Sequence, residues 1–241
     1  MNSRFVNIFY PFVSVRLGDE KFIKEALSGL TRNTILDIAC GAGKDILVLN
    51  SKNCVGIDIE GYPKEEVYKR GYKAALVYSG PDYYFKLDEP IDIVSCINLN
   101  AHIPFESLEK ILNQAFKQCS KNAHILLINE YYGGYTYEKH FKNDEKENAL
   151  INKMEHFYFE SEDSFLNKFG LAFPDLKMTN RKPLTTMVSS IQYKYYFFKD
   201  LKPYLLFYIA DFFIRLINFI ILKKEKKNQT AFLIGYVFKI N

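Results

Sequence analysis

The chain has 241 residues, of which 48% are hydrophobic and 25% are charged. This composition excludes a wholly disordered protein, and the length is sufficient for one α/β domain with a substantial core. The formal net charge is +4, and much of the excess lies in the short run 223–227, which we interpret as a solvated loop. A nucleic-acid-binding protein usually has a broader basic face, so we expect no nucleic-acid partner.

The four cysteines indicate neither a disulfide framework nor a metal site. Cys40, Cys54, Cys96 and Cys119 form no CxxC pair, and no histidine lies at metal-ligand spacing from them. We expect them to be small core residues in a reducing compartment. The first twelve residues lack the long apolar run of a secretory signal. A cytoplasmic location is therefore the expectation.

The first half of the chain alternates apolar runs with amphipathic stretches. We expect strands at 34–40, 53–59, 73–79, 90–99 and 123–130, with helices at 43–52, 62–72 and 106–120. Nearly continuous apolar strands separated by helices predict a mostly parallel sheet that is covered on both faces.

The second half has fewer expected elements. We expect a helix over 161–171, with Ser161 as its N-cap and Gly170 near its end. Strands are expected at 176–184 and 230–240. A long aromatic and aliphatic segment, 185–228, precedes the last strand.

The first expected strand ends in a glycine turn. Gly41 and Gly43 follow it directly, where a following helix would offer bare backbone N–H groups to a ligand. Parallel sheets bind ligands at the carboxyl ends of their strands, and Asp58 ends the next strand with an acceptor suited to a ribose diol. Together these features indicate a site for a nucleoside-bearing cofactor.

The same turn disfavours a nicotinamide-dependent oxidoreductase. Ile46 stands where the third glycine of a dinucleotide fingerprint would lie. Asp37, inside the first strand, places a negative charge beside the turn. That charge suits a cationic ligand without phosphates better than a pyrophosphate.

Four segments of the chain resemble one family. "ILDIACGAG", "VGIDIE", "PIDIVSCINLNAHI" and "AHILLINEYY" are similar to the motifs of class I S-adenosylmethionine-dependent methyltransferases. The resemblance covers residues 34 to 132 and includes Asp92 at the start of the fourth strand. It implies a Rossmann-like α/β fold with a mostly parallel seven-stranded sheet and helices on both faces. We expect a helical aromatic-rich insert before the last strand.

The resemblance also implies a cofactor site for S-adenosylmethionine, with S-adenosylhomocysteine as the product. Gly41 and Gly43 would let the backbone approach the methionine part and the ribose, Asp37 would lie near the methionine amino group, and Asp58 would accept the ribose hydroxyls. The family often places an acid near the adenine, where this chain departs from the pattern and offers Asp82. The expected cofactor-binding residues are Asp37, Ala39, Gly41, Gly43, Asp58, Ile59, Asp82 and Asn98.

The catalytic group is less defined, because a methyl transfer mainly requires positioning of the acceptor. Candidates that follow strand ends are His102, Glu130 and Tyr131. A structural or surface role for His102 and a cap or salt-bridge role for Glu130 remain alternatives. His140 is more typical of a solvated loop, and His156 is equally compatible with either role.

The acceptor is expected to be a small molecule. Amino-methyltransferases of nucleic acids often carry Asn/Asp-Pro-Pro-aromatic after the fourth strand, where this chain has "NLNAHI". We favour a small or sugar-type metabolite methylated at oxygen or nitrogen, in surface-glycan or secondary-metabolite biosynthesis. A binding or scaffold protein that has lost the chemistry, and a peripheral-membrane methyltransferase, are the alternatives.

We expect a single domain, 1–241, with a core at 34–132. The segment 1–33, including Tyr10, would form a lid or pack as a helix, and 133–160 would be an insert. The segment 185–228 would cap the substrate pocket, with Tyr193, Tyr195 and Tyr196 near the acceptor, or make a homodimer contact.

The stretch 201–222 is long and apolar enough to raise the question of a membrane. Asp211 and Arg215 lie four residues apart within it, and a charged pair in mid-span is costly in lipid. A transmembrane span is therefore disfavoured. Interfacial association remains an alternative.

Overall fold

The computed structural model describes residues 15–41, 43, 49, 51, 53–58, 68, 71–77, 84–131, 158, 160–185 and 233–240. Its centre is a seven-stranded sheet with the order β3-β2-β1-β4-β5-β7-β6. The strands are β1 (Thr34–Ile38), β2 (Asn53–Asp58), β3 (Ala74–Val77), β4 (Ile91–Ile97), β5 (Cys119–Glu130), β6 (Leu176–Thr185) and β7 (Leu233–Ile240). The described helices are α2 (Val15–Ala26), α5 (Phe105–Phe116) and α7 (Glu162–Ala172). The expected fold class, a mostly parallel seven-stranded α/β sheet, is confirmed, and the expected insert before the last strand lies outside the described residues.

Five neighbouring strands, β3 to β5, form a parallel half of the sheet. β1 pairs with β2 on one side and with β4 on the other. The strand order therefore reverses between β1 and β4, and their carboxyl ends meet at a topological switch point. All five of β1's residues are buried, as expected for a strand covered on both faces.

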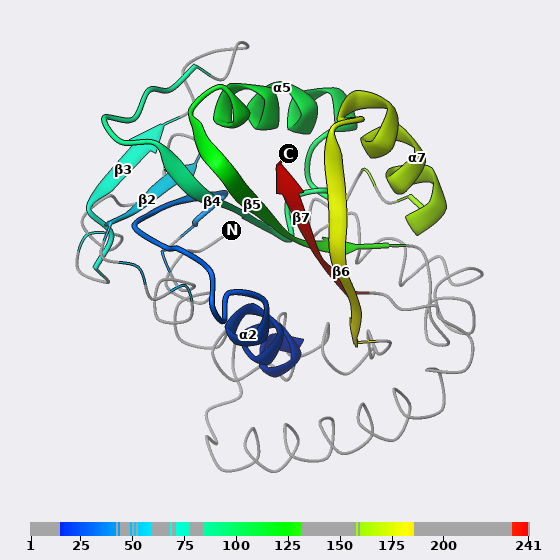
Figure 1. The fold of residues 1–241 in the computed structure, drawn as a ribbon. Coiled ribbons are helices and arrows are strands. Elements are labelled where there is room, and N and C mark those ends of the chain that lie inside the picture. Colours follow the sequence, from blue (N-terminus) through cyan, green and yellow to red (C-terminus); the bar gives the residue numbers. More distant parts are fainter. Residues whose placement is uncertain are drawn as a thin grey trace, which may run out of the picture.

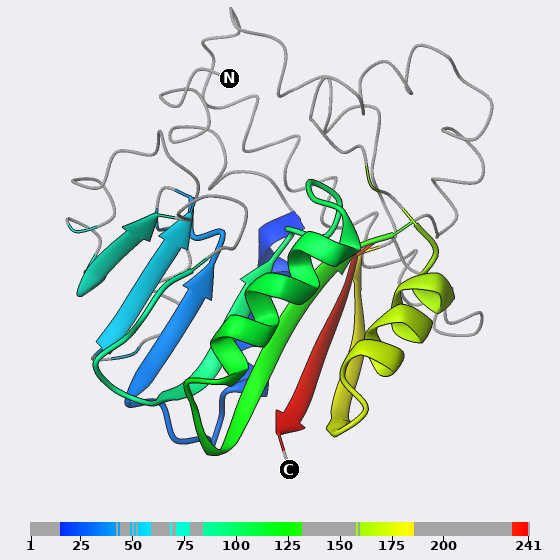
Figure 2. The same cartoon turned by 90° about the horizontal axis from the view of Figure 1, so that it is seen from above.

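β7 runs against its neighbours. It pairs antiparallel with β5 from His124↔Lys239 to Glu130↔Leu233, and antiparallel with β6 on its other side. Figure 2 shows its arrow pointing opposite to those of β1, β2 and β3. The sheet is thus mostly parallel with one reversed strand.

Helices cover both faces of the sheet. Figure 1 shows α2 on one face and α5 with α7 on the other. Phe22 and Ile23 of α2 are buried, and Phe22 lies directly against Gly235 of β7. A Cβ at Gly235 would come within 2.3 to 2.8 Å of three Phe22 ring atoms, so this close approach requires glycine.

The expected helix at 106–120 is correct in position but too long. α5 ends at Phe116, and β5 begins at Cys119 rather than at residue 123. The Gln118 side chain donates to the carbonyl of Phe85 and accepts from the amide of Leu87, and its carbonyl accepts from the amide of Ile91. These non-local bonds draw residues 118–120 into the sheet, which helical periodicity alone does not reveal.

α7 confirms the expected N-cap and the expected position of Gly170. The Ser161 hydroxyl accepts a hydrogen bond from the amide of Ser164 at 3.2 Å, as expected of an N-cap. Gly170 lies inside the helix, which ends at Ala172 with Phe173 as its C-cap. Gly170 is therefore near the end of the helix, as expected.

The cysteines are free thiols in the core, as expected. Cys40, Cys54 and Cys96 are buried and Cys119 is partly buried. Burial, and then the charge of Asp92, raises the pKa of Cys119 to about 12. Such thiols stay protonated and unreactive near neutral pH.

Several expected segments lie wholly or mostly outside the described residues: 1–14 of the N-terminal segment, with Tyr10, the helices at 43–52 and 62–72, the insert 133–160, and the segment 185–228, which includes 201–222. Among the described helices, none has the length and apolar character needed to cross a membrane.

Candidate cofactor site at the carboxyl ends of β1, β2 and β4

The chain turns sharply after β1. Ala39, Gly41 and Gly43 all have positive φ, at 60°, 52° and 72°. The amides of Ala39 and Cys40 donate to the carbonyl of Ile57 on β2, and the Gly43 amide donates to the Cys40 carbonyl at 2.8 Å. The turn is therefore held against the end of β2, and glycine is required at 41 and 43 for the left-handed backbone.

Asp58, the last residue of β2, contacts this turn directly. Its Oδ2 accepts a hydrogen bond from the Gly41 amide at 2.6 Å. The carboxylate is only partly buried and stands at the switch-point edge of the sheet. The structure therefore brings together two features that are 17 residues apart in sequence, the glycine turn and the acid.

Asn98 follows the end of β4, next to β1. It has a left-handed backbone with φ of 57°, which asparagine tolerates better than most residues, and its amide donates to the Ile128 carbonyl at 2.7 Å. Its side-chain Oδ1 is buried and has no hydrogen-bond donor among the described residues. A buried acceptor of this kind would suit the amino group of a ligand.

Asp37 lies one residue before the end of β1 and is 1% exposed. The hydroxyl of Tyr72, which is 3% exposed, donates to its Oδ2 at 2.5 Å. In register, Asp37 lies between Gly56 of β2 and Ser95 of β4. The absent side chain of Gly56 leaves the space that the Tyr72 ring and the Cys40 thiol occupy.

The ends of β4 and β5 are joined by a side chain that the sequence did not single out. Asn100 Nδ2 donates to the Glu130 carbonyl at 2.7 Å, and the Glu130 amide donates to Asn100 Oδ1 at 2.9 Å. Asn100 thus pairs with the Glu130 backbone as a neighbouring strand would. Glu130 is 8% exposed, whereas His102, in the turn after β4, is exposed to solvent. Both lie at the edge of the sheet formed by the carboxyl ends of the parallel strands.

The structure does not support the predicted catalytic role of Tyr131. This residue is completely buried, and its ring packs edge-on against Phe165 and Tyr236. Its hydroxyl accepts from Asn129 Nδ2 at 2.9 Å, and burial raises its pKa well above the usual range. The hydroxyl is therefore enclosed in the core.

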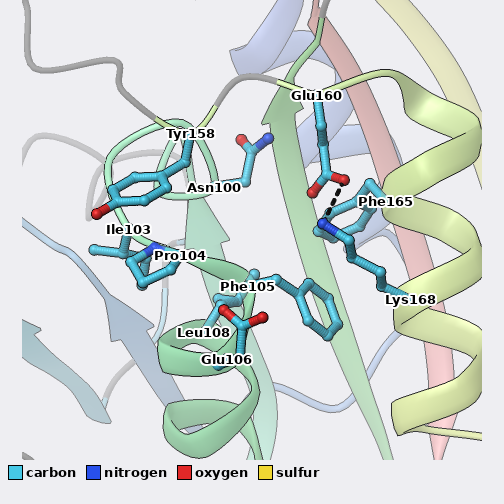
Figure 3. A pocket seen from close by; sticks show the side chains of 10 residues that line it. All are labelled: Asn100, Ile103, Pro104, Phe105, Glu106, Leu108, Tyr158, Glu160, Phe165 and Lys168. Atoms are coloured by element: carbon cyan, nitrogen blue, oxygen red, sulfur yellow. Dashed lines mark ion pairs between the residues drawn. The ribbon is translucent and has the colours of Figure 1, made fainter.

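A pocket of about 390 Å³ opens beside the residues that follow β4. It lies between the turn after β4, the first turn of α5 and the first turns of α7 (Figure 3). The Glu160 carboxylate pairs with Lys168 at 2.9 Å on one side. Its described lining residues are Asn100, Ile103, Pro104, Phe105, Glu106, Leu108, Tyr158, Glu160, Phe165 and Lys168.

Asp92, which belongs to the fourth-strand motif, lies at the opposite edge of the sheet. Its carboxylate accepts from the amides of Asn33 and Thr34 and from the Ser120 hydroxyl. It therefore ties together the beginnings of β1, β4 and β5, and its role is structural.

The remaining predicted residues belong to other parts of the chain. Ile59, Asp82, His140 and His156 lie outside the described residues, as do Tyr193, Tyr195, Tyr196, Asp211 and Arg215. Within the described ranges, no group of three or more His, Cys, Asp or Glu side chains could hold a metal ion.

Two solved structures that resemble this chain are described as methyltransferases. BpumL, a plantazolicin methyltransferase crystallised with a triazolic desmethylPZN analog and SAH, matches with a TM-score of 0.60 and 16% identity over 99% of this chain and 89% of that chain. A SAM-dependent methyltransferase from Thermotoga maritima, described as a possible histamine N-methyltransferase, matches with a TM-score of 0.60 and 13% identity over 99% and 98% of the two chains. This chain has the class I methyltransferase fold.

A third structure, the YcgJ protein from Bacillus subtilis, matches the methyltransferase fold of this chain with a TM-score of 0.56 and 16% identity over 95% and 97% of the two chains. No protein-family model matches the sequence, and no curated protein matches it either. The likeness therefore lies in the fold, and the chemistry has to be argued from the site.

The residues of the methyltransferase fold fit the cofactor that the sequence motifs imply. The turn at 39–43 brings bare backbone to the switch point, Asp58 offers an acid beside it, and the buried Asn98 Oδ1 has no donor among the described residues. The Asp58 carboxylate and Asn98 Oδ1 are hydrogen-bond acceptors for the hydroxyl and amino groups of a nucleoside that carries an amino acid.

Proposed function

We propose that this protein is an S-adenosylmethionine-dependent methyltransferase that acts on a small acceptor. The observation that carries the proposal is the contact between Asp58 and the Gly41 amide at the switch point of a methyltransferase fold. Asp58 and the glycine turn would hold the ribose and the methionine part, and Asn98 would receive an amino group. The bound cofactor would supply an electrophilic methyl group on a sulfonium.

The chain's own contribution is to place the acceptor and exclude water. The pocket beside β4 and α5 is the best candidate for the acceptor site, because Asn100 in its lining lies two residues beyond Asn98. Ile103, Phe105 and Phe165 give it apolar walls, while Glu106 and the Glu160–Lys168 pair give it polar ones. We infer an acceptor with an apolar or aromatic part and a nucleophilic oxygen or nitrogen.

Two groups remain candidates for removing a proton from the acceptor. His102 is exposed in the turn that leads into the pocket, and Glu130 lies at the end of β5. An imidazole operates near neutral pH without a large pKa shift, so His102 is the better candidate for a general base. A cytoplasmic location and a metabolite acceptor, with oxygen or nitrogen as the methylated atom, remain part of this proposal.

Calorimetric titration with S-adenosylhomocysteine tests the cofactor assignment. We expect Asp58→Asn to weaken binding by about tenfold or more, because one acceptor oxygen becomes a donor facing the ribose hydroxyls. Its remaining amide oxygen can still accept from the Gly41 amide. Asp88→Asn, an exposed acid after β3, changes the same charge and should leave binding unchanged.

Each outcome of this titration has a clear meaning. Absence of binding of either S-adenosylmethionine or S-adenosylhomocysteine to folded wild-type protein would contradict the methyltransferase proposal. Binding without transfer to any acceptor across a broad panel of alcohols, amines and thiols would favour a scaffold protein that retains the cofactor site.

The acceptor pocket has its own test once an acceptor is found. Tyr158→Ala and Glu106→Gln should raise KM for the acceptor while leaving the dissociation constant of S-adenosylhomocysteine unchanged, because both side chains line only the pocket. Glu109→Gln, on the same helix but outside the pocket lining, is the control. Equal changes in all three variants would contradict this location of the acceptor.

A further inference from the structure

Three buried polar side chains lie together on the α2 face of the sheet, beneath the glycine turn. Asp37 and Ser95 are register partners on β1 and β4, so they project from the same face. Tyr72, just before β3, belongs to the core cluster on that face. All three side chains are at least 97% buried. Ser95 Oγ has no hydrogen-bond partner among the described residues.

Tyr72 reaches Asp37 across a whole strand. Its neighbour β3 pairs with β2, and β2 separates β3 from β1. The route passes over Gly56, where an added Cβ would lie 3.1 Å from Tyr72 Cδ1 and 2.6 Å from Cys40 Sγ. A strand glycine, a cysteine of the turn and a tyrosine thus combine to bring one hydroxyl to one carboxylate.

The carboxylate influences its buried surroundings electrostatically. Burial and then the charge of Asp37 raise the pKa of the Cys96 thiol far above its usual range. A buried acid is costly unless hydrogen bonds satisfy it, and the Tyr72 hydroxyl supplies one. Because this bond fixes one carboxylate oxygen, it also limits the orientations that Asp37 can adopt.

We propose that Tyr72 is a positioning residue of the cofactor site, whose hydroxyl orients the Asp37 carboxylate for the α-amino group of S-adenosylmethionine. The inference rests on the proposed function. It assigns a role to a residue in the segment before β3, although its side chain does not stand at the switch-point edge.

The test uses two ligands that differ in the amino-acid part. S-adenosylhomocysteine carries the α-amino group, whereas 5′-methylthioadenosine keeps the nucleoside and the thioether and lacks it. Tyr72→Phe, which preserves the ring, should weaken S-adenosylhomocysteine about three- to tenfold, as loss of one hydrogen bond to a charged group predicts. Binding of 5′-methylthioadenosine should stay within about twofold, since no interaction with Asp37 is involved.

Two further variants complete the design. Tyr84→Phe removes a hydroxyl from a tyrosine that is 59% exposed and should change neither affinity. Asp37→Asn should weaken S-adenosylhomocysteine more than Tyr72→Phe does. The double variant should lose little more than Asp37→Asn alone, because the two residues act through one contact.

The outcomes separate this inference from the proposed function. If wild-type protein fails to bind S-adenosylhomocysteine, the proposed function itself is wrong. If it binds, but Tyr72→Phe has no effect, weakens both ligands equally, or adds fully to Asp37→Asn, Tyr72 is only a core residue and the inference is overturned. The double-mutant cycle of Tyr72→Phe and Asp37→Asn, measured with S-adenosylhomocysteine, tests the role of Tyr72 even if 5′-methylthioadenosine binds too weakly to measure.

Discussion

The two halves of the sheet use the same pair of groups, a buried tyrosine and a carboxylate, in different ways. In the parallel half, the Tyr72 hydroxyl donates to Asp37 beneath the glycine turn. In the antiparallel half, the Tyr236 hydroxyl donates to Glu162 Oε1 at 2.7 Å, and Arg181 forms two bonds of 2.6 Å to the same carboxylate. Glu162 is thus satisfied by a guanidinium from β6, and its network ties α7 to the sheet.

The two halves therefore differ in the expected role of their side chains, which is ligand binding in the parallel half and stability in the antiparallel half. The parallel half has the glycine turn, Asp58 and Asn98 at the carboxyl ends of its strands, where the change in strand order leaves room for a ligand. The antiparallel half is filled by aromatic rings, with Phe169 packed against both Phe173 and Phe238. We therefore expect substitutions in the first half to change cofactor binding and substitutions in the second to change mainly the free energy of unfolding.

A matched pair of glycine substitutions should give the largest effects. Gly235→Ala would force a Cβ into the Phe22 ring, and Gly56→Ala would displace Cys40 and Tyr72. We expect the free energy of unfolding to fall by about 3 kcal/mol for Gly235→Ala and about 2 kcal/mol for Gly56→Ala. Only Gly56→Ala should also weaken S-adenosylhomocysteine, because it moves Tyr72 from Asp37.

Chemical denaturation and calorimetry of both variants test this pair. Phe22→Leu should cost less in the Gly235→Ala background than in the wild type, because the smaller side chain relieves the clash. Equal loss of cofactor affinity in the two glycine variants would contradict the division between the halves.

Removal of the guanidinium in the antiparallel half should have the next largest effect. Arg181→Met leaves the partly buried Glu162 carboxylate without its two charged hydrogen bonds, so we expect a loss of about 2 kcal/mol in unfolding free energy. Affinity for S-adenosylhomocysteine should not change. Lys182→Met, which removes the exposed pair with Glu25, is the control and should leave stability nearly unchanged. An affinity change in Arg181→Met would show that the halves are coupled.

A smaller effect, and a gain, is expected at the glycine turn. Ala39 has φ of 60°, where an L-residue with a Cβ is strained. Ala39→Gly should raise the free energy of unfolding by about 0.5 kcal/mol. The relief of backbone strain in the folded state outweighs the cost of the larger conformational entropy that glycine gives the unfolded chain. Thermal unfolding measures the gain, and Ala26→Gly at the end of α2, where a helical residue is replaced, should lower stability instead.

The smallest effect concerns His124, at the seam between the two halves. Burial, and then the charge of Lys239 opposite it, lowers the pKa of His124 below its ordinary 6.5. As the pH falls through 6.5, the unfolded chain takes up the proton before the folded protein does. The contribution of neutral His124 to stability is therefore fully present above that pH and is lost as the pH falls. His124→Gln should remove this small part of the acid sensitivity.

An NMR titration of the imidazole checks the cause. Lys239→Met should raise the pKa of His124 but leave it below the ordinary value, because burial is the larger cause and remains. A midpoint that does not respond to Lys239→Met would mean that the cation across the strand pair has no influence.

Much of the fold could be predicted because it depends on local patterns. Continuous apolar runs at 34–38, 53–58 and 91–97 indicate buried parallel strands whatever their neighbours, and Ser161 caps α7 through a contact three residues away. Gly41, Gly43 and Asp58 could likewise be assigned to one site, because strand ends of a parallel sheet meet at one edge. The end of α5 was missed because Gln118 is held by partners distant in sequence.

The sequence by itself determined the order of elements, the glycine turn and the acid that ends β2, since each follows from residue types within one segment. The tertiary structure alone decided which side chains meet across strands. Tyr72 reaches Asp37 only because Gly56 leaves space between them, and Tyr131 is enclosed only because β7 and α7 pack over it. Such contacts depend on register and on the absence of intervening atoms, which no local pattern encodes.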